Sequence, residues 1–258
     1  MSNINLAIHC VRSLLCSGVL LLAACGATPT HPSKPHDAAV ANTQLGSAYL
    51  NQGELALAKE KLDKAVAEDP NNPEVHSMRA LLFVRLGEHD KADAEFRTAL
   101  RLAPHDPNVI NNYAVYLCQN GRTDEGVKRF EEAARNALYR TPESAYTNAG
   151  VCLRAAKRDA DARLRFQQAL QLRPTYAEAV YQLADLDFQQ KDLQAARQRI
   201  DAYLNGTSET PDLLLLAVRV ARAQNDRLGA QRYARKLQLN FPGTEQTRAL
   251  AGLDANPG

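Results

Sequence analysis

The sequence predicts an all-α fold that is built from about six stacked pairs of helices. Alanine, leucine, glutamine, arginine and glutamate are plentiful, which is a composition that favours helices over strands. Gly53, Gly87 and Gly121 are spaced by 34 residues, and Pro70 and Pro104 are separated by the same interval. A generic helical bundle has no reason to keep one register along the chain, so this interval indicates a repeat architecture.

The N-terminus is expected to be a lipoprotein signal peptide over residues 1–24. Its apolar segment follows Arg12 and has about eleven residues. A membrane-spanning helix needs about 20 residues, whereas a signal-peptide core needs about 7–15. The segment ends in "LAAC", which resembles the bacterial lipobox. The resemblance implies that the chain is cut before Cys25 and that this cysteine is acylated. A plain signal peptide with a coincidental cysteine is the alternative.

The residues after Cys25 bear on the compartment. Gly26 stands where aspartate marks inner-membrane retention in bacteria that use this signal. We therefore expect a lipoprotein of the outer membrane that faces the periplasm and is held in the lipid bilayer through acylated Cys25. Prolines recur in the segment that follows, so residues 25–38 are expected to be a flexible linker.

The rest of the mature chain divides into six units and a tail. The units are 39–72, 73–106, 107–142, 143–176, 177–210 and 211–244. Unit 1 carries Gly46 in its first helix and Ala58, Leu62 and Ala65 in its second. This spacing resembles the tetratricopeptide repeat (TPR), which implies a right-handed superhelix of helix-turn-helix units. Residues 245–258 are expected to be a C-terminal tail, either a short helix or a frayed end.

Each position of the repeat has a physical role. Small residues in the first helices let the second helices approach closely; they are Gly46, Ala80, Ala114 and Gly150. Large residues in the second helices fill the space between units; they are Phe96, Phe130 and Phe166. Glycine at the turn of units 1 to 3 can take a positive φ and end the first helix. Units 4 to 6 have Lys157, Lys191 and Asn225 there, which is weaker turn chemistry. Gly126 and Asp187 depart from the pattern of units 3 and 5.

The sequence offers no recognisable catalytic chemistry. It has no glycine-rich phosphate loop, zinc-protease helix or nucleophile elbow, and the repeats occupy nearly the whole mature chain. We therefore expect no enzyme activity, no cofactor and no metal site; an enzyme with a hidden site is the remaining alternative. The net charge of +2 is spread along the chain, so nucleic acid is not an expected partner. His76 is expected to pack between helices rather than act as a ligand or base.

Two cysteines remain after the signal is removed and Cys25 is acylated. Cys118 and Cys152 lie late in the first helices of units 3 and 4. First helices of neighbouring units pack side by side, and the periplasm is oxidising, so we expect a disulfide between them. Two buried free thiols are the alternative.

The first helices are expected to line a concave groove that binds a protein segment. The outward positions of units 1 to 3 are mostly apolar, hydroxyl or amide side chains. The predicted groove residues are Val40, Thr43, Ser47, Leu50, Ser77, Leu81, Val84, Asn111 and Val115. Such a surface suits an extended or helical peptide with apolar anchors.

One family joins a lipobox, a linker, six TPR units and this cysteine pair. The segments "INNYAVYLCQNGRTDEGVKRFEEA" and "TNAGVCLRAAKRDADARLRFQQAL" resemble the PilF/PilW family of type IV pilus biogenesis lipoproteins, the secretin pilotins. The resemblance implies a scaffold that binds the type IV pilus secretin and promotes its outer-membrane localisation and multimer assembly, and hence pilus biogenesis and twitching motility. A TPR-like lipoprotein adaptor for β-barrel assembly or for cell-wall enzymes is the alternative.

Overall fold

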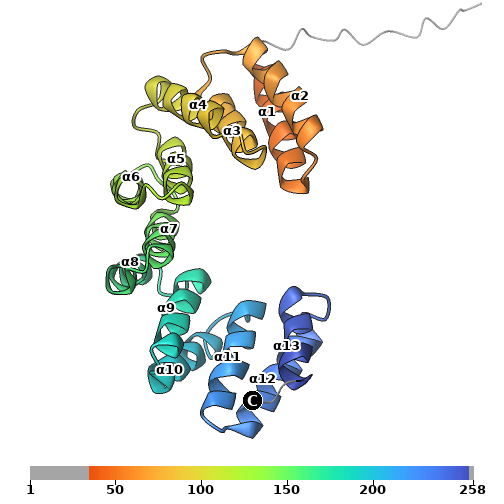
Figure 1. Cartoon of the computed structure of the whole chain (residues 1–258), viewed down its shortest axis with the longest axis vertical. Coiled ribbons are helices and arrows are strands. Elements are labelled where there is room, and N and C mark those ends of the chain that lie inside the picture. The colour runs from red at the N-terminus through yellow and green to blue at the C-terminus, as the bar shows by residue number, and fades with distance from the viewer. Residues whose placement is uncertain (1–34, 256–258) are drawn as a thin grey trace, which may run out of the picture. The chain divides into compact units, whose positions relative to one another are not determined.

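The computed structural model describes residues 35–255, with the side chains of residues 35–252. These residues form thirteen helices and no strand (Figure 1). In chain order the helices are α1 (Pro35–Gln52), α2 (Leu55–Glu68), α3 (Pro73–Arg85), α4 (His89–Leu102), α5 (Pro107–Gln119), α6 (Thr123–Arg135), α7 (Pro142–Ala155), α8 (Asp159–Leu172), α9 (Ala177–Gln189), α10 (Leu193–Leu204), α11 (Pro211–Ala223), α12 (Arg227–Asn240) and α13 (Glu245–Ala255). The predicted all-α class is therefore confirmed.

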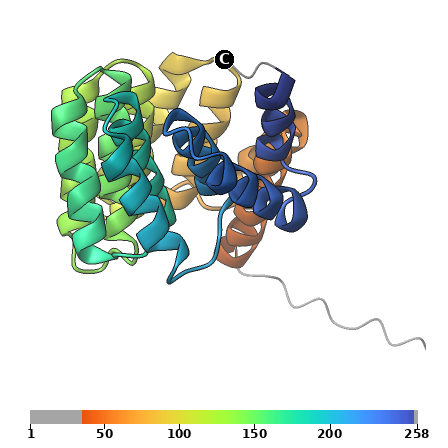
Figure 2. The same cartoon turned by 90° about the horizontal axis from the view of Figure 1, so that it is seen from below.

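Each of the six expected units holds one pair of helices. Figure 2 shows the helices of the middle units side by side as parallel rods. Helix α1 begins within the expected linker, four residues before unit 1. The expected tail contains helix α13, which packs on α11 and α12. None of the described helices has the length and apolar character that a membrane crossing requires.

Several first helices begin with a capping residue that is followed by proline. The side chains of Asn72 and Asp106 accept hydrogen bonds from backbone N–H groups of the first turn, and Pro73 and Pro107 follow them. The cap satisfies N–H groups that have no partner within the helix. Proline fits the next position because it has no N–H to leave unsatisfied and its φ is already helical. The sequence thus fixes where these helices start.

The turns between paired helices share one backbone conformation. Glycine adopts it in the first three units, at Gly53 (φ +81°), Gly87 (φ +74°) and Gly121 (φ +75°). Other residues adopt it in the last three units, at Lys157 (φ +59°), Lys191 (φ +64°) and Asn225 (φ +61°). The left-handed region costs an L-residue roughly 1–2 kcal/mol, so the repeat geometry imposes a strained turn on units 4 to 6.

Small residues in the first helices bring the paired helices close together. A Cβ atom at Gly46 would lie 2.6 Å from Cγ of Leu62, and one at Gly150 would lie 2.3 Å from Cε1 of Phe166. Both distances are too short for a methyl group. The large side chain of the second helix therefore occupies the space that glycine leaves in the first.

The core lies between successive units and is continuous along the repeats. Phe96, Phe130 and Phe166 are at most 1% exposed. The ring of Phe96 lies 5.5 Å from that of Tyr113 and 5.2 Å from that of Tyr116, both in the next unit. Because units 2 to 4 bury these phenylalanines, and units 1 and 5 bury a leucine and an isoleucine at the same position, stability comes from stacking.

Unit 5 replaces an aromatic contact with buried charge. Asp187 of α9 is only 2% exposed. Its Oδ1 lies 2.6 Å from Nη1 of Arg163 on α8, and its Oδ2 lies 3.1 Å from Nη2 of Arg199 on α10. The two guanidinium groups offset the cost of burying the carboxylate, and the three residues tie units 4 and 5 together.

The contacts between helices define an inner side of the array. Each first helix from α1 to α11 touches the first helix of the next unit, or α13 at the end of the series. Among the described residues, a second helix touches only its own partner and the first helix that follows it. The first helices therefore lie closer together than the second helices, and they form the inner face.

Candidate protein-binding groove

The nine residues that were predicted to line the groove divide into two groups. Six of them are half-buried on the first helices: Val40, Ser47, Leu81, Val84, Asn111 and Val115. The other three are buried: Thr43 (3% exposed), Leu50 (6%) and Ser77 (1%). A partner in the groove has no access to this second group, so the expectation that these three side chains line the groove is wrong.

The three buried residues make contacts within the protein, and two of them link different helices. The hydroxyl of Thr43 donates to the backbone carbonyl oxygen of Ala39 at 2.7 Å. Leu50 belongs to a cluster of buried apolar residues at the junction of units 1 and 2. The hydroxyl oxygen of Ser77 accepts a hydrogen bond from Nδ2 of Asn112 at 3.2 Å, which links α3 to α5. Leu50 and Ser77 thus contact neighbouring helices, and the Thr43 hydroxyl is satisfied by the backbone of its own helix.

An apolar hollow lies in the groove at the seam between α5 and α7. Its volume is about 200 Å³. It is lined by Val115, Cys118 and Gln119 of α5, Phe130 of α6, and Asn148, Val151, Cys152 and Ala155 of α7. Ligand pockets for drug-sized molecules usually measure about 300–1,000 Å³, so this hollow suits a single apolar side chain.

The hollow joins a predicted residue to one that the prediction missed. Val115 was expected in the groove, and Val151 was not, although Val151 is 41% exposed. The two valines occupy the same repeat position in units 3 and 4, each directly after the small residue of the first helix (Ala114 and Gly150). The repeat register therefore contained the signal that would have found Val151.

A disulfide forms part of the wall of the hollow. Cys118 and Cys152 are bonded, with their Cα atoms 5.6 Å apart. The bond joins α5 to α7 beside Val115 and Val151. A hydrogen bond from Nδ2 of Asn148 to Oδ1 of Asn111, at 3.4 Å, links the same two helices. The hollow thus lies on a seam that is cross-linked covalently and by an amide pair.

Gly126 explains why unit 3 departs from the repeat pattern. A Cβ atom at this position would lie 2.4 Å from Sγ of Cys118 and 3.0 Å from the backbone oxygen of Ala114. The alanine of the other units would therefore collide with the cysteine that forms the disulfide. Glycine lets α6 pack closely behind the cross-link.

The inner face becomes more polar toward the C-terminal units. Nη2 of Arg154 on α7 lies 2.7 Å from Oδ2 of Asp185 on α9. The guanidinium of Arg219 on α11 lies 5.0 Å from the centre of the Phe188 ring. Burial, together with nearby carboxylates, raises the pKa of the Tyr181 hydroxyl, so this group stays neutral at physiological pH. Charged and aromatic side chains are thus present on the first helices of units 4 to 6.

His76, on α3, lies between two hydrogen-bond acceptors from outside this helix. Its Nδ1 is 2.7 Å from a carboxylate oxygen of Glu95, and its Nε2 is 2.8 Å from the backbone oxygen of Pro70. Both partners accept hydrogen bonds, so the arrangement is satisfied fully when both ring nitrogens carry a proton. The hydrogen bond with Glu95, opposed by burial, raises the pKa of the His76 side chain. The contacts of this histidine are those of a residue that ties helices together.

Three predicted features remain: the absence of a metal site, the signal peptide and the acylation of Cys25. The residues with described side chains include no cluster of three or more histidine, cysteine, aspartate or glutamate side chains that could hold a metal ion. The signal peptide and the acylation site at Cys25 lie outside the described residues.

The chain matches known proteins over most of the repeat region. The tetratricopeptide repeat family matches residues 43–107 and 114–177, and a second tetratricopeptide repeat family matches residues 153–219. The type IV pilus assembly protein PilF of Pseudomonas aeruginosa is 31% identical over 201 residues, which cover 78% of this chain and 80% of PilF.

Solved structures give the same result. The structure of Pseudomonas aeruginosa PilF is similar with a TM-score of 0.65 and 30% identity, and covers 84% of this chain and 98% of that one. The crystal structure of PilW, a type IV pilus biogenesis factor, is similar with a TM-score of 0.66 and 27% identity, and covers 83% and 98%. The chain therefore belongs to the tetratricopeptide-repeat family of type IV pilus biogenesis proteins that includes PilF and PilW.

Proposed function

We propose that this protein is a pilotin, a lipid-anchored scaffold on the periplasmic side of the outer membrane that binds the type IV pilus secretin and promotes assembly of its multimers. The likeness to PilF over four-fifths of both chains carries the assignment to pilus biogenesis. The lipobox at Cys25 supports a role at a membrane, because a protein acylated there stays with the bilayer that receives it.

The inner groove offers a physical basis for binding a protein segment. Val115 and Val151 border an apolar hollow of about 200 Å³, and amide side chains lie beside it. A secretin segment would place one apolar side chain in the hollow and use the amides for backbone hydrogen bonds. The disulfide keeps α5 and α7 at a fixed distance, so the site does not need to be ordered when the partner binds.

A deletion strain tests the cellular role. Secretin multimers that resist detergent should disappear in the deletion, return with the wild-type gene, and fail to return with Cys25→Ala. Normal multimers and normal pili in the deletion strain would contradict the proposal. Co-purification dominated by β-barrel assembly or peptidoglycan proteins would favour the adaptor alternative.

A groove variant tests the binding site separately. Val151→Glu places a charge at the mouth of the hollow without disturbing the core, because this side chain is 41% exposed. Loss of one apolar anchor at an interface corresponds to about a tenfold weaker affinity. Leu164→Glu is the matched control, because Leu164 is exposed on a second helix, away from the groove. Equal secretin binding by the two variants would exclude the hollow as the site.

A further inference from the structure

Helix α12 differs in charge from the second helices of the other units. It contains Arg227, Arg232, Arg235 and Lys236 and no carboxylate. The other five second helices all contain at least one aspartate or glutamate besides their basic residues. The positive charge of α12 is therefore a local feature and not a property of the repeat.

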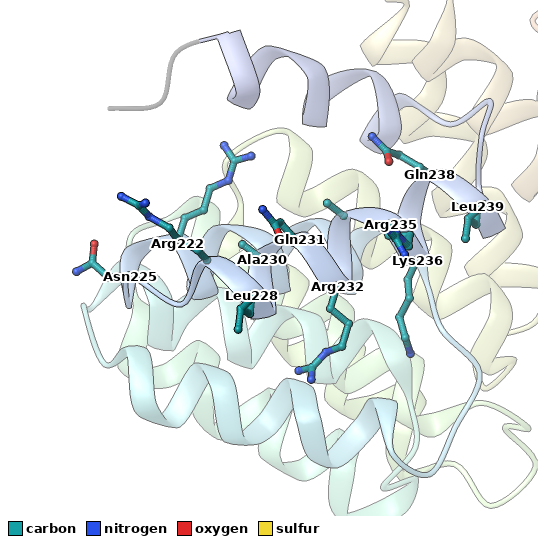
Figure 3. Close-up of a pocket in the computed structure, with 12 residues that line it drawn as sticks. Arg222, Asn225, Leu228, Ala230, Gln231, Arg232, Arg235, Lys236, Gln238 and Leu239 are labelled. Atoms are coloured by element: carbon teal, nitrogen blue, oxygen red, sulfur yellow. The ribbon is translucent and has the colours of Figure 1, made fainter.

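These cations line a large, open hollow on the last unit (Figure 3). Its volume is about 1250 Å³, and its twelve lining residues come from α11, α12 and the turn between them. The lining includes Arg222, Arg227, Arg232, Arg235 and Lys236 and no acidic side chain. The hollow thus has one sign of charge, which attracts a partner of the opposite sign.

Three arginines of the hollow have no ion-pair partner among the residues whose side chains the structure describes: Arg227, Arg232 and Arg235. The guanidinium of Arg232 lies over the Tyr233 ring, 5.1 Å from its centre. Lys236 has a carboxylate partner, Glu209 of the loop before α11.

Two exposed leucines flank the arginines. Leu228 is 81% exposed and Leu239 is 72% exposed. In the other five units, the position of Leu228 holds alanine, aspartate or glutamine. The position of Leu239 holds alanine, arginine, glutamine or asparagine. The leucines are eleven residues apart, which is about 16 Å or three turns of a helix. This pattern places an apolar contact at each end of a basic surface.

We propose that this basic hollow on α12 is a second docking site, which binds an acidic amphipathic helix of a partner protein. Carboxylates of that helix would pair with Arg232 and Arg235, and its apolar side chains would cover Leu228 and Leu239. The exposed leucines at both ends of the arginine pair favour a protein helix, because its apolar side chains can cover them while its carboxylates pair with the arginines. The lining residues of the basic hollow all belong to the last unit, so the site does not overlap the hollow between α5 and α7.

The test uses the mature chain with Cys25→Ala, so that the protein is not acylated. The probe is a fluorescein-labelled peptide that forms an amphipathic helix, with leucines eleven residues apart and glutamates between them. Arg232→Gln/Arg235→Gln should weaken binding of this peptide by about a hundredfold, and Leu228→Ala/Leu239→Ala by about tenfold, measured by fluorescence anisotropy. Rising salt should weaken the binding by wild type.

The control removes the same charge from another second helix. Arg97→Gln/Arg101→Gln changes two arginines of α4 and should leave binding unchanged. A probe with lysine in place of glutamate should not bind. Failure of the acidic probe to bind overturns the proposal. Equal binding of the probe by the Arg232→Gln/Arg235→Gln variant and the Arg97→Gln/Arg101→Gln variant also overturns it.

A membrane arm separates the two sources of negative charge. The probes are vesicles of 30% phosphatidylglycerol in phosphatidylcholine. Replacing Arg232 and Arg235 should not change how much protein binds to these vesicles. If it does, and the peptide does not bind, the surface serves a lipid bilayer and the proposal is wrong. Secretin multimers are scored in the same variants, since loss of peptide binding with normal multimers separates this site from the pilotin role.

Discussion

The disulfide makes a quantitative prediction about stability. Replacing Cys118 and Cys152 with alanine removes a cross-link between residues that are 34 apart in the sequence. In the chain-entropy account, a closed loop of 34 residues lowers the entropy of the unfolded chain by about 12.6 cal/mol/K, which is about 3.8 kcal/mol at 25 °C. We therefore expect the free energy of unfolding of the oxidised protein to fall by about 4 kcal/mol in the double variant.

Urea unfolding followed by far-UV circular dichroism measures this loss. With an m-value near 3 kcal/mol/M, the midpoint should fall by about 1.3 M. Reductant should lower the midpoint of the wild type toward that of the double variant and leave the variant unchanged. Hydrogen exchange should increase most in α5 to α8, because the bond joins units 3 and 4 and each unit depends on its neighbours.

Two results would refute this reasoning. The first is an unchanged midpoint in the double variant and in reduced wild type. The second is alkylation of both Cys118 and Cys152 in native protein without prior reduction, which would show free thiols in place of the bond.

Three further predictions follow from local geometry. Gly126→Ala should destabilise the oxidised protein by about 1–3 kcal/mol, because the new methyl group meets Sγ of Cys118 at 2.4 Å; an unchanged urea midpoint would contradict this contact. Lys157→Gly should raise the midpoint by an amount equivalent to about 0.5 kcal/mol, since relief of the positive φ exceeds the added freedom of the unfolded chain; a lower midpoint would show that the turn is unstrained. The raised pKa of His76, caused first by its hydrogen bond to Glu95, adds stability that is complete below the ordinary histidine pKa and is lost as pH rises through the folded-state value. The free energy of unfolding should fall over that window in wild type, and His76→Gln should flatten this part of the pH profile.

The repeat period predicted the architecture because each element has a local signal. Proline after a capping residue starts α3 and α5, and a residue with positive φ ends each first helix within the pairs. Phenylalanine at one position of the second helix, such as Phe96, marks the contact with the next unit. These signals depend on neighbours in the sequence or on one neighbouring unit, so they can be read without knowing the full packing.

The groove was harder to predict because it depends on how far apart the first helices lie. Thr43 and Ser77 have polar side chains at outward positions, yet both are buried: Thr43 hydrogen-bonds to the backbone of its own helix, and Ser77 hydrogen-bonds to Asn112 of α5. Helical periodicity gives the direction of a side chain but not the distance to the next helix. The hollow beside Val151 depends on the same distance, although the repeat position that Val151 shares with Val115 could have identified this residue.

The contact between Gly126 and Cys118 has a consequence for the history of the family. The cysteine pair and the glycine form one unit that mutation can assemble or dismantle only in a certain order. Glycine has to replace the repeat's alanine before, or together with, the arrival of the bulky bonded sulfur. Once the cross-link has been lost from a lineage, nothing in this contact opposes the return of alanine, the better helix former. Among related sequences, alanine at this position should therefore occur with loss of the cysteine pair, and glycine should accompany its presence.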